Sequence, residues 1–304
     1  MYYIHAISSI THQNTFRIDN IIKELSPIKE NSNLISPDYK EFIPGAALRR
    51  LSPVLRIGLT AAIDCKNKIG KKFDAISVGT ALGCLRDTEK FLKTFHTSTS
   101  DFISPTSFIQ STHNTIAGQI SLGLKNHAYN MTHTQNNLSF EMALIDAIMC
   151  INEGKINVLV GSADEKTPFL ELLQPKIISK KYPLSTGGSF FSISKTKNKI
   201  GIIDVKTIFN SKNTELEIKD FLKKHKYETK DIDVILHSDS NIEIPKSCHF
   251  INFLKYSGLY YSASSFALHF AHDYLISKNK NSALIVNDIC IDKVGLILIK
   301  SNEA

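Results

Sequence analysis

The residues with the clearest chemical implication form a short polar corner, T-Q-N-N at 134–137, between a predicted strand at 128–133 and a predicted helix starting at Ser139. A helix N-terminus stabilises negative charge, so α/β enzymes can hold a nucleophile at such a corner. The corner has no cysteine, and the carboxamide of Gln135 or Asn137 cannot form a thioester. Ser139 is the nearby hydroxyl that could replace a thiol, although a serine at a helix start is typical of an N-cap.

The elements around the corner are predicted to be buried. The helix after it has apolar residues at helical spacing and on its other faces, so we expect it to be central: Phe140, Ala143, Leu144, Ala147, Ile148, Ile151, Met142, Ile145 and Met149. Four of the five residues at 156–160 are aliphatic, which predicts a buried strand. Upstream, Pro105 stands at the first position of a helix predicted to span 105–122.

Two further regions have a regular order of elements. A buried strand at 75–79 leads into G-T-A-L-G at 79–83, a glycine turn without the spacing of a nucleotide-binding loop. After residue 198 the predicted order is strand 199–208, a helix from Thr214 to His225, strands 232–236 and 248–253, helix 262–276, and strands 283–286 and 294–299. This order repeats that of the first half at the level of elements, without a residue-level repeat.

Three motifs together resemble the β-ketoacyl synthases, condensing enzymes that join acyl chains held on carrier proteins. They are G-T-A-L-G with T-E-K-F at 88–91, S-P-T-S-F-I-Q-S-T-H-N-T-I-A-G-Q at 104–119, and the polar corner with S-F-E-M-A-L-I-D-A at 139–147. The resemblance implies an α/β thiolase fold, with duplicated βαβαβαββ halves in layered α-β-α-β-α order. We place an N-terminal half at 1–198 and a shortened C-terminal half at 199–304.

The resemblance also identifies degenerate catalytic positions. The family carries its cysteine at the corner, and two registers place either Asn137 or Gln135 there. His237 stands at the place of the first catalytic histidine, but S-D-S follows it. Lys255 matches the family's lysine, whereas Leu259 and Tyr260 stand where the second histidine is expected, and N-D-I-C-I-D at 287–292 replaces the closing glycine loop. Neither leucine nor tyrosine can serve as that cation, so the resemblance implies an inactive homologue.

Inactive homologues of this kind are chain-length factors, and the motifs most resemble those of aryl polyene and flexirubin-type pigment clusters. The resemblance implies a heterodimer with an active ketosynthase, an acyl carrier protein as second partner, and strand 128–133 pairing antiparallel across the dimer. Candidates for the interface or the acyl tunnel are Phe108, His113, Asn114, Met131, Phe140 and Met142, for which ordinary packing or hydrogen bonding is the alternative. Two other functions stay open: a divergent synthase or acyltransferase using Ser139 or another non-cysteine nucleophile with His237, and a homodimeric scaffold that binds carrier protein.

The amino-acid composition limits which partners, cofactors and cellular location we expect. The net charge is +7, and much of the excess lies between Lys195 and Lys230. We interpret it first as a solvated face and second as a docking surface for an acidic carrier protein; no DNA-binding motif accompanies it. We expect no cofactor and no metal site, because the cysteines stand singly: Cys65, Cys84, Cys150, Cys248 and Cys290. No membrane-length apolar run and no basic signal-peptide start are present, which favours a cytoplasmic location.

Overall fold

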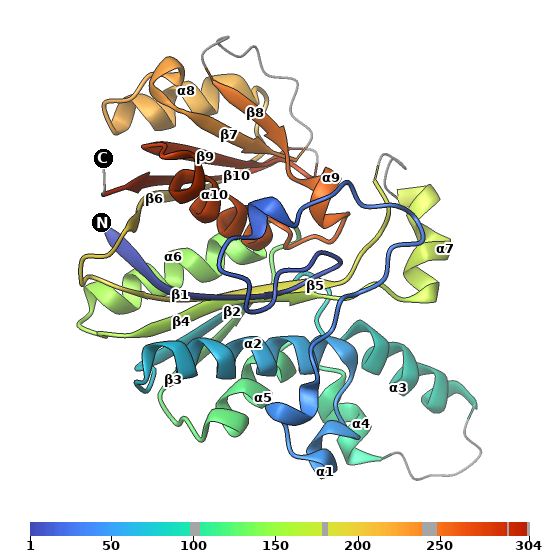
Figure 1. Ribbon diagram of the computed structural model, residues 1–304. Helices are drawn as coiled ribbons and strands as arrows, with labels where there is room; N and C mark the ends of the chain where they lie inside the picture. The colour runs from blue at the N-terminus through green and yellow to red at the C-terminus, as the bar shows by residue number, and fades with distance from the viewer. Residues whose placement is uncertain (98–103, 178–181, 239–247, 291, 303–304) are drawn as a thin grey trace.

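Ten strands form one hydrogen-bonded sheet in the computed structural model, which describes residues 1–97, 104–177, 182–238, 248–290 and 292–302 (Figure 1). The first five are β1 (Tyr2–Ile10), β2 (Ala75–Gly79), β3 (Tyr129–His133), β4 (Val158–Asp164) and β5 (Gly187–Ser194). The others are β6 (Ile200–Phe209), β7 (Val234–His237), β8 (His249–Asn252), β9 (Ser282–Asn287) and β10 (Lys293–Ser301). The buried strands predicted at 75–79, 156–160, 232–236 and 283–286 all overlap these.

The strand order has a two-fold repeat. It reads β3-β2-β4-β5-β1 and then β6-β10-β9-β7-β8, so the second five strands follow the first five in mirrored order. In each set four strands run in one direction and one, β5 or β10, runs in the opposite direction. Within the described strands, the two sets are hydrogen-bonded to each other only where Tyr2 and Tyr3 of β1 pair with Ile202 and Gly201 of β6. This is the duplicated thiolase arrangement that the sequence predicts; the boundary at residues 198 and 199 stays a prediction.

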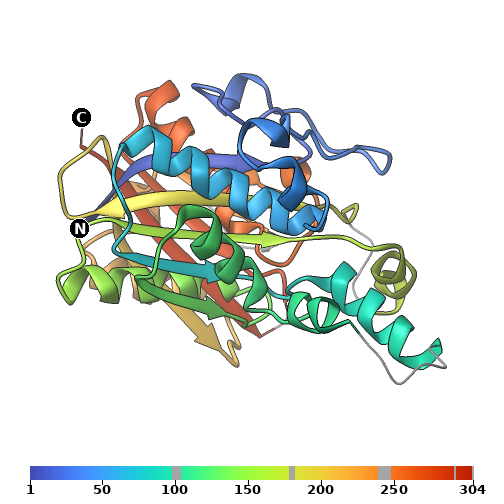
Figure 2. The ribbon, with the colours of Figure 1, turned by 90° about the horizontal axis from the view of Figure 1, so that it is seen from below.

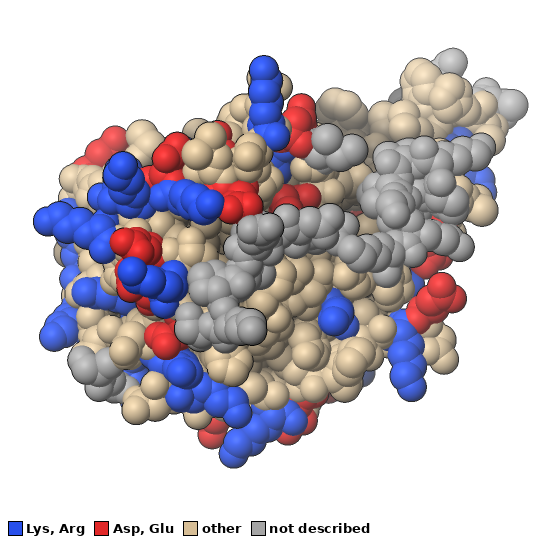
Figure 3. Space-filling model, turned by 90° about the horizontal axis from the view of Figure 1, so that it is seen from above, with Lys and Arg blue, Asp and Glu red and all other residues tan. Residues whose placement is uncertain are grey.

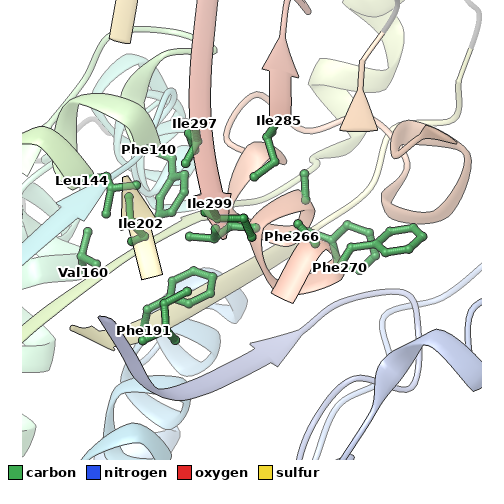
Figure 4. Packing of buried hydrophobic residues seen from close by; sticks show 14 of the residues in the cluster. Phe140, Leu144, Val160, Phe191, Ile202, Phe266, Phe270, Ile285, Ile297 and Ile299 are labelled. Carbon is green, nitrogen blue, oxygen red and sulfur yellow. The ribbon is translucent and has the colours of Figure 1, made fainter. Parts of the chain in front are cut away.

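Helices lie between and outside the two sets of strands, which gives the layered order α-β-α-β-α in Figure 1. The central layer holds α6 (Ser139–Asn152) and α10 (Ser264–Lys278). The outer layers hold α2 (Pro53–Ile69) and α5 (Thr115–Leu124) on one side and α8 (Thr214–Lys224) on the other. Phe140 and Leu144 of α6 and Phe266 of α10 point into one apolar core with side chains of both sets of strands (Figure 4). Burying this continuous core is the main source of stability.

The helix predicted at 105–122 is wrong as a single element. The structure has α4 (Pro105–Gln110) and α5, separated by a turn that contains His113 and Asn114. The Oγ1 atom of Thr115 donates to the carbonyl of Ile109 at 2.7 Å, so a hydroxyl takes a carbonyl that a continuous helix would use. The Cα atom of His113 also lies 3.0 Å from the Cβ position that Gly83 lacks, so the turn packs directly on the glycine turn.

A helical hairpin projects from the body of the protein (Figure 2). It consists of α3 (Leu85–Thr97) and α4, and α3 has no buried residue although its sequence is amphipathic. Phe91 packs on Phe95 and on Phe108, with ring centroids 6.4 and 5.7 Å apart. Phe95 and Phe108 are nevertheless 58% and 59% exposed. The chain therefore leaves an aromatic surface uncovered.

Several lysines of the basic stretch at 195–230 form ion pairs with acidic side chains of the same chain. Four of its lysines form ion pairs, and the charges of both signs are mixed on the face that carries α8 (Figure 3). The pairs are Lys206–Glu217, Lys219–Glu215, Lys224–Asp204 and Lys230–Glu228. This arrangement is what a solvated face requires. Among the helices that the structure describes, none is both long enough and apolar enough to cross a membrane.

Candidate functional site

The polar corner lies where β3 ends, next to the carboxyl end of β2. Asn136 has a left-handed backbone conformation, with φ +53°, which lets the chain reverse into α6. Gly79 at the end of β2 permits the approach, because a Cβ atom there would lie 2.4 Å from the carbonyl oxygen of Ser139. The N-cap predicted at Ser139 is wrong by one residue: the cap position is Leu138. The Ser139 hydroxyl instead accepts from the Gln135 amide at 2.8 Å and donates to the Asn136 carbonyl at 2.7 Å.

The two nucleophile positions differ in exposure. Gln135 is exposed, whereas Asn137 is fully buried and hydrogen-bonded to the second half of the chain. Its Nδ2 atom donates to the Asn287 side chain at 3.4 Å and to the Lys293 carbonyl at 3.3 Å. Asn287 Nδ2 donates back to the Asn137 carbonyl at 2.6 Å. The amide of Asn137 thus connects the two halves and is shielded from solvent.

A buried carboxyl group lies one helical turn beyond Asn137. Glu141 is fully buried, and its Oε1 atom accepts from Asn287 Nδ2 at 2.9 Å, while Oε2 has no hydrogen-bond partner. The absence of a side chain at Gly295 makes room for it, since a Cβ atom there would lie 2.7 Å from Oε1. Burial raises the pKa of Glu141 to about 7, against the hydrogen bond from Asn287, which lowers it. The carboxyl group is therefore protonated in part of the molecules at neutral pH.

The first histidine position is preserved in place but not in its surroundings. His237 ends β7, is 8% exposed, and stacks on Phe250 with ring centroids 3.7 Å apart. The next residue, Ser238, donates its hydroxyl to Asp288 and accepts from the Asp288 amide at 2.7 Å. Ser238 therefore joins the ends of β7 and β9. Asp239 and Ser240 lie outside the described residues.

The second histidine position is filled by buried residues. Leu259 and Tyr260 are each 4% exposed and follow α9 (Leu254–Ser257) after Gly258, which has φ +69°. They line a cavity of only about 10 Å³, next to Asp164 at the end of β4. Burial raises the pKa of the Tyr260 hydroxyl, so this side chain stays neutral. Lys255 lies on α9 with an exposed side chain.

The interface and tunnel candidates fall into two groups. Phe108 and Met131 are 59% and 42% exposed, and His113 and Asn114 are exposed on the same turn. Asn114 accepts from Thr132 of β3 at 3.3 Å, so this turn is tied to the edge strand. By contrast, Phe140 is fully buried against Phe191, and Met142 accepts from Thr207 of β6 at 3.7 Å. The second group has the contacts of ordinary core residues.

No group of three or more His, Cys, Asp or Glu residues in the described part of the chain is placed to hold a metal ion. The thiol nearest to the glycine turn in sequence is Cys84, which follows Gly83 directly. Cys84 is fully buried, and burial raises the pKa of its thiol. It therefore lacks both the access and the ionisation that a nucleophile needs.

Sequence reasoning missed two buried carboxyl groups, Glu141 and Asp164. Glu141 is a charged residue in the first turn of a helix that is apolar on most sides, and Asp164 follows a run of aliphatic residues at the end of a buried strand. A charge among apolar neighbours is rarely buried without a partner, so both positions carried a usable signal.

A polar corner opening a buried central helix, between two mirrored sets of five strands, defines a protein of the thiolase fold. The chain belongs to the beta-ketoacyl synthase family: residues 26–190, more than half of its length, match the model of the beta-ketoacyl synthase N-terminal domain. No curated protein matches the chain in sequence.

Solved structures share this fold at low sequence identity. The ishigamide ketosynthase/chain length factor superposes with a TM-score of 0.83 at 13% identity, covering 99% of both chains. A type II polyketide ketosynthase solved with its acyl-carrier protein, AntDE:AntF, has a TM-score of 0.80 at 14% identity, also over 99% of both chains. The ketosynthase ApeO in complex with its chain length factor ApeC, from Xenorhabdus doucetiae, has a TM-score of 0.61 at 14% identity over 98% of both chains.

Proposed function

We propose that this chain is a non-catalytic, chain-length-factor-like subunit that pairs with an active β-ketoacyl synthase in type II polyketide or polyene synthesis. The observation that supports this proposal most strongly is that the polar corner has carboxamide side chains at both candidate nucleophile positions. Gln135 and Asn137 offer carboxamides, and the amide of Asn137 is buried and bonded to Asn287 and Lys293. An acyl group cannot be transferred to a carboxamide to give a thioester, so condensation requires a thiol from another chain.

The loss of the second histidine supports the same function. Leu259 and Tyr260 leave a cavity of about 10 Å³, which is too small for an acyl chain. Leucine donates no hydrogen bond to a developing oxyanion, and the Tyr260 hydroxyl is buried without a hydrogen-bond partner. His237 and Lys255 are of the residue types expected at their catalytic positions. In this proposal the chain has no nucleophile with which they could act.

The surface supports a partner subunit. β3 is an edge strand whose outer edge is unpaired in the described chain, and Tyr129 and Met131 on it are 38% and 42% exposed. An exposed strand edge is usually covered, and antiparallel pairing with the corresponding strand of a ketosynthase would cover this one. The aromatic surface at Phe95 and Phe108 adds apolar area to be buried. The proposed second partner is an acyl carrier protein, which would bring the acyl chain to the catalytic subunit.

Co-expression with a ketosynthase encoded beside this chain tests the proposal. We expect a heterodimer by native mass, condensation of carrier-bound substrates by the pair, and none by this chain alone. Replacing the partner's cysteine with alanine should abolish the activity, whereas Ser139→Ala in this chain should leave it. Condensation by this chain alone that is lost in Ser139→Ala would establish the divergent enzyme instead.

The interface has its own test. Met131→Lys places a charge on the edge strand and should weaken the heterodimer, whereas Leu216→Lys, on the exposed face of α8 at 55% exposure, serves as the matched control. A stable homodimer that binds carrier protein and ignores the ketosynthase would favour the scaffold function.

A further inference from the structure

A second polar pocket lies away from the corner, where the ends of β1 and β4 meet α2 and α7 (Pro168–Ile177). Its volume is about 340 Å³, within the range of small-molecule sites. The side chains that matter for binding are His12, Arg86, Glu165, Lys166, Glu171 and Thr186. The proposed function gives none of them a role.

Three helices begin at this pocket. Pro53 is the first residue of α2, Arg86 the second of α3 and Pro168 the first of α7, and all three line the pocket. These helices have 17, 13 and 10 residues, so each brings the positive end of a full helix dipole. Converging N-termini favour a bound anion.

A pocket at the opposite end of the strands is surrounded by helix C-termini instead of N-termini. It has a volume of about 580 Å³ and is lined by Lys72, Lys125 and Lys155. These lysines follow the C-termini of α2, α5 and α6, where helix dipoles are negative and attract cations from the same chain. That pocket therefore has an internal explanation for its lysines and needs no ligand.

The charges at the N-terminal pocket leave one cation unpaired. Lys166 pairs with Glu171 at 2.9 Å, so these two charges offset each other. Arg86 is exposed and makes no ion pair with any residue that the structure describes. A planar guanidinium at the mouth of a pocket can bind a carboxylate or phosphate through two parallel hydrogen bonds.

Two buried polar groups that line the pocket are incompletely bonded. Glu165 is 2% exposed; its Oε1 atom accepts from the Arg86 amide at 3.0 Å, and the Val54 backbone interacts with the carboxyl group and lowers its pKa, while Oε2 makes no hydrogen bond of normal geometry. His12 is 7% exposed and accepts from the Thr186 amide at Nε2, at 3.2 Å, which leaves the proton on Nδ1, also without a partner. Burial raises the pKa of Glu165 to about 7 and lowers that of His12 to about 4. Buried polar atoms are rarely left unpaired, so these two atoms point to a ligand.

We propose that this pocket binds a small oxyanion, a carboxylate or a phosphate, that also carries a hydrogen-bond donor. The Arg86 guanidinium binds the oxyanion, the dipoles of the three helices favour its negative charge, and Glu165 accepts from the donor. Thr186 and His12 form the polar wall of the pocket. The site is separate from the corner and extends the function of the chain beyond pairing with a synthase.

Titration calorimetry on the full chain, alone or in its complex, tests the proposal with acetate, glycolate and inorganic phosphate at fixed ionic strength. We expect saturable binding below roughly 10 mM, with glycolate tighter than acetate because glycolate has a donor. Phosphate binding tighter than glycolate would identify a phosphate ligand, and the opposite order a hydroxy acid. Arg86→Gln should weaken binding roughly tenfold or more.

Lys93→Gln is the matched control, because Lys93 is exposed on the same helix and the change in charge is the same. Its affinity should equal that of the unchanged chain. The proposal fails if none of the three anions saturates, or if Lys93→Gln weakens binding as much as Arg86→Gln, since the effect would then be general charge screening.

Discussion

Two buried carboxyl groups at the contact between the halves differ in how they are satisfied. Asp164 accepts at Oδ1 from Thr80 Oγ1 and from the next two backbone amides, at 2.8, 2.9 and 3.2 Å, and at Oδ2 from the amide and hydroxyl of Ser262, at 3.1 and 2.6 Å. Glu141 accepts one hydrogen bond of normal geometry, from Asn287, and interacts more weakly with the Ser264 side chain. Burial raises the pKa of both groups. The same cost of burial is offset by five donors in one case and by one in the other.

The difference assigns the two groups different roles. Five donors fix Asp164 as a structural link that connects the glycine turn of the first half to the start of α10 in the second. Glu141 stands beside the corner, and burial raises its pKa to about 7, so that it is ionised in only part of the molecules at neutral pH. We infer that the link at Asp164 preserves the fold, while the corner has been free to change its chemistry.

Removing Asp164 tests the comparison most severely. Asp164→Ala leaves five buried donors without an acceptor, and we expect a loss of more than about 4 kcal/mol in the free energy of unfolding. Urea denaturation measures it, with Asp220→Ala on the exposed side of α8 as the control. A loss below about 1 kcal/mol would show that Asp164 is not a structural link.

Glu141→Gln tests the role of the second carboxyl group through the pH dependence of the free energy of unfolding. The pKa of Glu141 is raised from 4.5 to about 7, so the folded state binds a proton that the unfolded state releases, and stability falls as pH rises from about 4.5 to 7. Glutamine does not ionise and removes this loss. The variant should gain about 2–3 kcal/mol relative to the unchanged chain between pH 5 and pH 8.

Denaturation of both chains at the two pH values measures the gain, and only the difference between them is interpreted, because other groups titrate in both. A constant difference from pH 5 to pH 8 would mean that Glu141 ionises normally in the folded state.

Gly295→Ala tests whether the space for Glu141 is specific. The added Cβ atom would meet Oε1, Cδ and Cγ of Glu141 at 2.7–2.9 Å, so we expect a loss of about 1–3 kcal/mol. Glu141→Ala in the same chain removes the clash, and a double-mutant cycle should show a favourable coupling. Gly118→Ala, with no atom within 4 Å of the new Cβ, is the control. If the losses in the free energy of unfolding from Gly295→Ala and Glu141→Ala were additive, the two residues would not be in direct contact.

Local sequence patterns predicted the strands and central helices because burial imposes periodicity. β2 agrees with its predicted residues, and α6 begins at the predicted Ser139. The break between α4 and α5 was not predictable, since it depends on a hydroxyl of Thr115 bonding to Ile109 and on close packing against Gly83. The partners of Asp164 and Glu141 were equally hidden: Ser262 and Asn287 are distant in sequence, and only the association of the halves brings them together.

Ser262→Ala is the smallest change in the series and the most informative about the link. It removes the 2.6 Å hydrogen bond from the hydroxyl to Asp164 but keeps the backbone amide as a donor, so we expect a loss of about 1–2 kcal/mol. Thr80→Ala removes the corresponding bond on the other oxygen. Because both hydroxyls stabilise one carboxylate, the double variant should differ from the sum of the single losses by more than about 0.5 kcal/mol. Strict additivity in urea denaturation would mean that the two oxygens act independently and that Asp164 does not transmit a constraint from one half to the other.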